Sequence, residues 1–79
     1  MVHDEDLLDR MRRHPVGWRY AELARMLRRS GFAESARGSH RTWRHPAGIS
    51  VTLVDRPGDV LALYVRKVVA AVTRAREAE

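Results

Sequence analysis

The stretch that decides the fold is ARGSHRTWRHPAGISVTLV, residues 36–54. It holds two segments of strand length, HRTWRH (40–45) and ISVTLV (49–54), and the second alternates apolar with hydroxyl-bearing side chains. A glycine-containing triplet precedes each segment, RGS (37–39) and PAG (46–48), and such residues favour tight turns. The pattern therefore predicts antiparallel strands joined by short hairpins.

Outward from this stretch, FAESAR (32–37) predicts one more strand before the first turn. Apolar side chains recur at helical spacing in three other segments, which predicts helices over 4–14, 19–31 and 60–77. Gly31 is expected to cap the second helix and Asp59 to cap the third, whose apolar face should include Leu61. The last residues, 75–79, are expected to fray.

The predicted order is α-α-β-β-β-α in a single domain that spans residues 1–79. Three antiparallel strands have two faces, and one of them must be covered by apolar helix surfaces. The expected fold is therefore α+β, with a three-stranded antiparallel sheet and the helices packed on one of its faces.

Strand alternation assigns the side chains of residues 40–45 to these two faces. Arg41 and Trp43 share one face, whereas His40, Thr42 and Arg44 share the other. If Trp43 joins the aliphatic residues under the helices, His40 is exposed on a polar, basic face beside a glycine turn.

The charge of the chain is concentrated. The formal net charge is +5, and residues 10–44 hold ten arginines against two glutamates. Such a region favours a polyanion, because each phosphate contact releases counterions. An arginine-rich codon usage would give the same composition without any such role.

Several classes of protein are excluded or disfavoured. There is no cysteine, so no disulfide can form and no thiolate can bind metal or attack a substrate. No apolar run approaches the length of a membrane span, and the N-terminal MVHDEDLLDR lacks the basic start of a signal peptide. The four histidines have no ligand spacing, so neither a metal nor another cofactor is expected. The expectation is a cytoplasmic protein with no membrane partner.

These residues together resemble the HicA family. The resemblance rests on RRSGF (28–32), then RGSH (37–40), Trp43 and RHP (44–46), followed by a closing helix with YVRKVV (64–69), and it covers most of the chain. HicA proteins are toxins of type II toxin–antitoxin pairs. The resemblance implies a double-stranded-RNA-binding-domain-like fold, an endoribonuclease activity on messenger RNA (an mRNA interferase), and a HicB-type antitoxin partner.

The resemblance also places the catalytic residue, the histidine of Gly-Ser-His, at His40. Histidine can take or give a proton near neutral pH, so it could activate the 2′-hydroxyl of RNA without a metal. The substrate-binding candidates surround it in the chain, and Arg41 is the weakest of them because alternation turns it to the other face. They are Arg37, Gly38, Ser39, Arg41 and Arg44.

Two other functions stay open on the sequence. One is an RNA-binding module of the same fold that does not cut, since a basic face has no special need for His40. The other is an inactive toxin that is retained because it binds an antitoxin. Fold analogy alone does not choose among the three.

Overall fold

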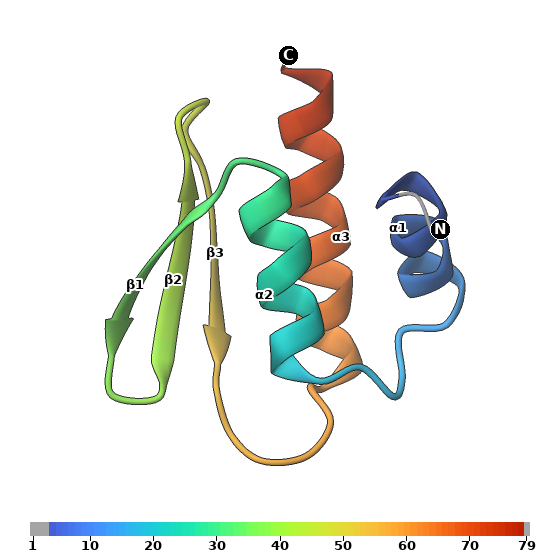
Figure 1. Ribbon diagram of the computed structural model, residues 1–79, viewed down its shortest axis with the longest axis vertical. Helices are drawn as coiled ribbons and strands as arrows, with labels where there is room; N and C mark the ends of the chain where they lie inside the picture. The colour runs from blue at the N-terminus through green and yellow to red at the C-terminus, as the bar shows by residue number, and fades with distance from the viewer. Residues whose placement is uncertain (1–3, 79) are drawn as a thin grey trace.

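The computed structural model describes residues 4–78, and its elements follow the predicted order. They are α1 (Asp4–Arg13), α2 (Tyr20–Arg29), β1 (Ala33–Arg37), β2 (His40–His45), β3 (Ile49–Val54) and α3 (Ala62–Glu77). The strands form one antiparallel sheet in the order β1-β2-β3 (Figure 1). The predicted α+β class and element order are confirmed.

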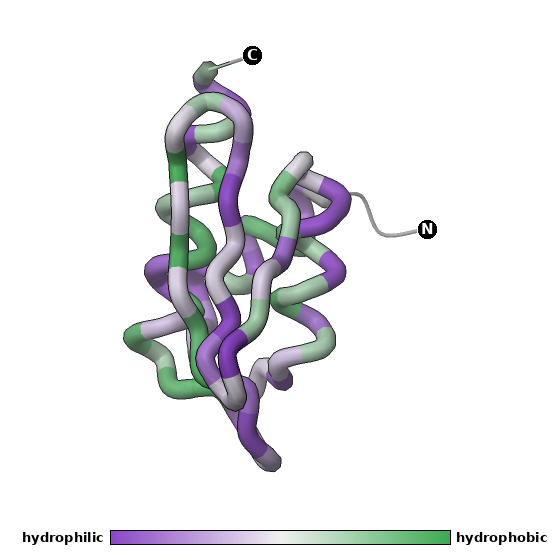
Figure 2. The backbone as a smooth tube through the Cα atoms, turned by 90° about the vertical axis from the view of Figure 1, so that its left-hand side faces the viewer, coloured by the Kyte–Doolittle hydropathy of each residue, from purple (hydrophilic) through white to green (hydrophobic). Residues whose placement is uncertain are grey.

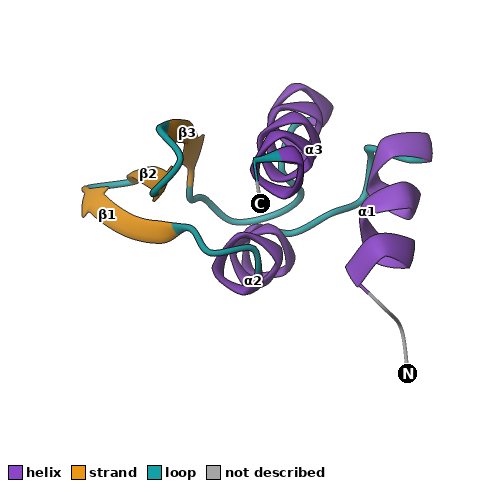
Figure 3. Cartoon of the chain, turned by 90° about the horizontal axis from the view of Figure 1, so that it is seen from above, coloured by secondary structure: helices purple, strands orange, loops and turns teal. Residues whose placement is uncertain are grey.

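The helices lie on one side of the sheet in two layers (Figure 3). Next to the strands are α2 and α3, and α1 packs against α3 on the side away from the sheet. No helix of residues 4–78 covers the other face of the sheet, which we call the open face. Figure 2 looks onto this side and shows β2 as mostly hydrophilic, whereas β3 alternates.

The hairpin between β1 and β2 has a two-residue loop, because Arg37 pairs directly with His40. Gly38 has a φ of +59°, whereas Ser39 has no positive φ, which is the pattern of a type II′ turn with glycine first. The Ser39 carbonyl also accepts a hydrogen bond of 2.7 Å from the backbone N–H of Asp55, just after β3. The turn is therefore held within its own β1–β2 hairpin and is also bonded to the chain just after β3.

The core fills the space between the sheet and the helices. The predicted alternation of β3 is confirmed, because Ile49, Val51 and Leu53 are buried and the hydroxyl-bearing residues between them are exposed. Trp43 is fully buried as predicted. The largest fully buried helix side chains are Met11, Leu23, Met26, Leu27, Val65, Val68 and Val72. Each contributes about 1.5–3 kcal/mol by leaving water, so this core carries the fold.

The start of α3 differs from the prediction. Asp59 does not cap the helix, which begins at Ala62 after Leu61, a residue whose side chain forms no cap. Instead, Asp59 forms a backbone bridge with Arg19 at the start of α2. That pairing holds the chain extended, so the helix begins later than its apolar pattern suggests.

The same pairing places Val60 in the core instead of the predicted Leu61. Val60 donates a backbone hydrogen bond of 2.7 Å to the Trp18 carbonyl and is 8% exposed, whereas Leu61 is 53% exposed. In the segment expected to fray, α3 runs to Glu77 and Ala75 is buried. Residue 79 of that tail lies outside the described residues.

Candidate functional site

His40 is the first residue of β2, and its exposed side chain lies on the open face. Its direct partners are Arg37 on β1 and Val54 on β3, and directly paired residues share a face of the sheet. Within residues 4–78 the imidazole forms no hydrogen bond or ion pair. The packing of the fold therefore leaves this side chain free for another molecule.

Arginines and hydroxyl groups surround His40 on the open face. Arg37 and Arg44 are both exposed, and Arg44 reaches across to the Ser35 hydroxyl at 3.3 Å. The Thr42 and Thr52 hydroxyl oxygens lie 3.2 Å apart on neighbouring strands. None of the strand residues on this face is acidic. The face therefore presents cations and hydrogen-bond donors that no carboxylate of the strands neutralises.

Arg41 lies on the helix side of the sheet, as alternation predicts, and is not brought together with His40. Its guanidinium lies 3.4 Å from an Asp55 oxygen and 3.8 Å from a Glu34 oxygen. Its side chain is 31% exposed, and its Nε is buried with no hydrogen-bond partner. The structure thus uses Arg41 to hold β2 to β1 and to the loop after β3.

Glu34 is the centre of this group of side chains. It accepts a hydrogen bond from the Tyr20 hydroxyl, which in turn accepts one of 3.2 Å from the Trp43 indole N–H. Arg28 lies 3.4 Å from Glu34 and 5.1 Å above the Trp43 ring. Burial, followed by the hydrogen bond to Glu34, raises the pKa of Tyr20 to about 12. This network fastens α2 to β1 and β2 and so supports the sheet that presents His40.

Sequence reasoning missed Glu34, although two signals pointed to it. It is one of two acids in the arginine-rich segment 10–44. It also pairs directly with Trp43, so alternation puts both on the covered face. A partly buried carboxylate needs cationic or hydrogen-bonding partners, and nearby arginines were available.

A second cluster joins Gly31, Phe32 and His45. The Phe32 and His45 rings lie 5.1 Å apart, and the His45 Nδ1 accepts a hydrogen bond of 3.0 Å from the Ala47 backbone. Gly31 has a φ of +93°, and a Cβ there would lie 3.2 Å from two atoms of the His45 ring. The glycine–phenylalanine pair and the second histidine of the sequence pattern are therefore used in packing.

Comparison with protein-family models, with curated proteins and with solved structures finds no match to this chain. No helix within residues 4–78 has both the length and the apolar character needed to cross a membrane. In the same residues, no group of three or more His, Cys, Asp or Glu side chains is placed to hold a metal ion. The site is therefore interpreted from its own geometry.

Proposed function

We propose that this protein is an endoribonuclease toxin of the HicA kind, with His40 as its general base. The main support is a contrast within one sequence pattern. Gly31, Phe32 and His45 pack against one another, whereas His40 is exposed and forms no hydrogen bond or ion pair within residues 4–78. The fold carries His40 at a fixed turn on a basic face without using it for stability.

In the proposed reaction, the neutral imidazole removes the proton of a 2′-hydroxyl of messenger RNA. The resulting oxygen attacks the adjacent phosphorus, and the bond from phosphorus to the 5′ oxygen breaks. The departing oxygen takes a proton from the imidazolium or from water. The products are a 2′,3′-cyclic phosphate and a 5′-hydroxyl end. One positioned general base supplies a rate increase of about 10²–10⁴-fold, and the reaction requires no metal ion.

The neighbouring residues act on the phosphate. Arg37 and Arg44 hold it and stabilise the negative charge that grows on its oxygens. The Ser39 hydroxyl donates a hydrogen bond, and Gly38 leaves room for the RNA backbone. Arg41 has no direct role here, because its guanidinium faces Glu34 and Asp55 instead.

A toxin needs a means of silencing. The resemblance supplies a HicB-type antitoxin as the partner and the cytoplasm as the place of action. A cover over the open face would keep RNA away from His40, and the cationic character of that face suits an acidic cover.

One observation favours a second candidate, an RNA-binding module that does not cut. Among the strand residues of the open face, all in the described part of the chain, His40 is the only imidazole and there is no carboxylate. A second proton-transfer group is therefore missing from this face, whereas binding needs only its cations. An inactive toxin that still binds its antitoxin would have the same residues on this face.

The test compares the purified wild-type protein with His40→Ala in two assays, RNA cleavage with mapped ends and RNA binding. His14→Ala is the matched control, because His14 is also exposed but lies between α1 and α2. Cleavage is run in the presence and absence of EDTA. Growth arrest on induced expression is scored for all three proteins.

The proposal expects wild type and His14→Ala to leave 5′-hydroxyl ends with EDTA present, and His40→Ala to lose at least 100-fold in cleavage while still binding RNA. Equal cleavage by His40→Ala would refute the proposed role. Binding without cleavage by all three proteins would establish the second candidate. Failure of the soluble proteins to bind RNA or arrest growth would favour an inactive toxin that binds an antitoxin.

A further inference from the structure

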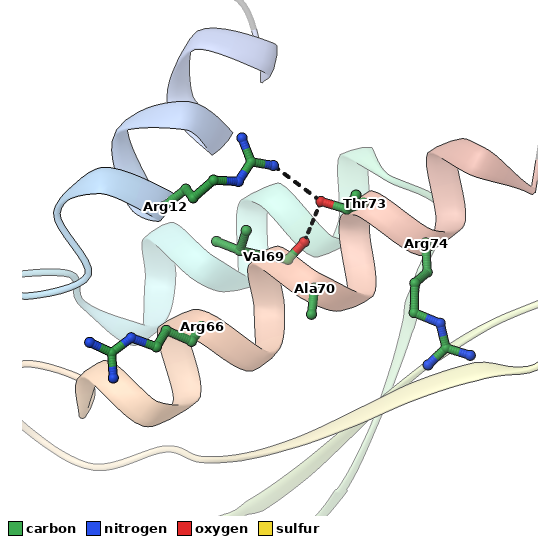
Figure 4. A pocket seen from close by; sticks show the side chains of 6 residues that line it. All are labelled: Arg12, Arg66, Val69, Ala70, Thr73 and Arg74. Carbon is green, nitrogen blue, oxygen red and sulfur yellow. Dashed lines mark hydrogen bonds between the residues drawn. The ribbon is translucent and has the colours of Figure 1, made fainter.

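A groove with a cavity volume of about 530 Å³ lies between α3, in the helix layer next to the sheet, and α1, in the outer layer (Figure 4). Its lining residues are Arg12, Arg66, Val69, Ala70, Thr73 and Arg74. Figure 4 shows Arg12 reaching from α1 toward Thr73, whereas Arg66 and Arg74 extend from opposite ends of this part of α3. The groove is thus an apolar strip with a cation on each of three sides.

The three arginines are positioned by different means. Arg12 donates to the Thr73 hydroxyl at 3.4 Å, and Thr73 donates to the Val69 carbonyl at 2.7 Å, which fixes the α1 side of the groove. Arg66 and Arg74 are exposed, and their side chains form no ion pair within residues 4–78. No carboxylate lines the groove. Within residues 4–78, Arg66 and Arg74 therefore have no intramolecular anion, whereas Arg12 lies 3.6 Å from an Asp9 oxygen.

The groove continues toward the sheet. A second hollow shares Ala70 and Arg74 with it, and its other lining residues include Lys67 on α3 and Thr52 on β3. Among the described strands, β3 pairs with β2 alone and forms one edge of the sheet. The cationic surface thus extends from α1 across α3 to an unpaired strand edge.

We propose that this groove binds an acidic protein segment that has an apolar stripe. Carboxylates of the segment would pair with Arg66 and Arg74, and its small apolar side chains would rest on Val69 and Ala70. The apolar floor favours a peptide over RNA, because phosphates have no use for it. A second copy of this chain is disfavoured by its net charge of +5. The inference does not depend on catalysis at His40.

The probe is a synthetic 18-residue peptide of glutamate, leucine and alanine, designed as a helix with one acidic and one apolar face. A peptide of the same composition in scrambled order, without such faces, is the first control. A 16-base-pair RNA duplex is the second. Binding to the full-length protein is followed by amide chemical shifts at 150 mM salt.

Three variants locate the site. Arg66→Ala/Arg74→Ala removes the free cations, and Ala70→Glu places a carboxylate on the floor. Arg25→Ala/Arg56→Ala removes two exposed arginines elsewhere and is the matched control. All these positions are exposed, so the fold should persist, and circular dichroism checks it.

The proposal expects the amphipathic peptide to shift amides of residues 66–74. The groove double variant and Ala70→Glu should each weaken this binding at least tenfold, and the control double variant by less than twofold. Equal binding of the scrambled peptide, or equal loss in the control variant, would overturn the proposal in favour of diffuse charge attraction. Larger shifts of the groove amides with the RNA duplex would overturn it in favour of nucleic acid.

Discussion

Replacing Gly31 with alanine should destabilise the fold by about 1–4.6 kcal/mol, because two costs coincide there. The positive φ of +93° costs a residue with a side chain about 1–2 kcal/mol. The new Cβ would lie 3.2 Å from two atoms of His45. That ring is held by Phe32 and by the Ala47 N–H, so it cannot swing away freely.

The range follows from adding these effects. Comparable overpacking costs about 1–3 kcal/mol. Alanine also restricts the unfolded chain, which offsets about 0.4–1 kcal/mol of the loss. Domains are stable by about 0.05–0.15 kcal/mol per residue, or roughly 4–12 kcal/mol for 79 residues. The substitution should therefore remove a large fraction of the stability.

Urea denaturation followed by tryptophan fluorescence measures the change. Gly48→Ala is the matched control, because Gly48 has a φ of +84° but a Cβ at that position would meet no atom within 4 Å. It should cost only the backbone part, about 0–1.6 kcal/mol. In a His45→Ala background, Gly31→Ala should cost a similarly small amount. The reasoning is refuted if Gly31→Ala costs no more than Gly48→Ala, or if its cost is unchanged without the His45 ring.

Two further predictions concern the network around Glu34. The pKa of Tyr20 is raised from 10.0 to about 12, so its contribution to stability is complete below pH 10 and is lost as the pH rises toward 12. Tyr20→Phe should be less stable than wild type at pH 7 and should lose stability less steeply between pH 10 and 12. Urea titrations at each pH measure this, and an equally steep alkaline loss would contradict it. Tyr64→Phe is the control for the loss of a phenol. Trp43→Phe should cost roughly 1–3 kcal/mol, because it leaves a gap in the core and removes the indole N–H that donates to Tyr20. In combination with Tyr20→Phe, the two losses should be less than additive, and strict additivity in urea denaturation would show that this hydrogen bond contributes nothing.

The local sequence pattern was sufficient to predict the strands of the sheet and which of its faces carries His40. A strand repeats every two residues, so the burial of Trp43 and the exposure of His40 follow from neighbouring residues alone. The glycine at position 38 likewise fixes the turn locally. These features could be predicted because no distant segment competes for them.

Features that depend on distant segments could not be predicted. Asp59 has the residue type of a helix cap, but its backbone pairs with Arg19, which is far away in sequence. The ion pairs of Arg41 involve Glu34 and Asp55, which precede and follow β2 in the chain. The groove beside α3 needs an arginine from α1, so only the tertiary packing reveals it.

The contact between α1 and α3 has a consequence for the order of folding. Arg12 and Thr73 touch although 61 positions separate them, whereas the strands pair with immediate neighbours in the chain. Local hairpins form quickly, but contacts across a long loop come late. During synthesis, α1 leaves the ribosome with Leu8 and Met11 uncovered until residues 62–77 have followed. Among the three described helices, α1 is thus made first but completes its packing only after α3 has been made.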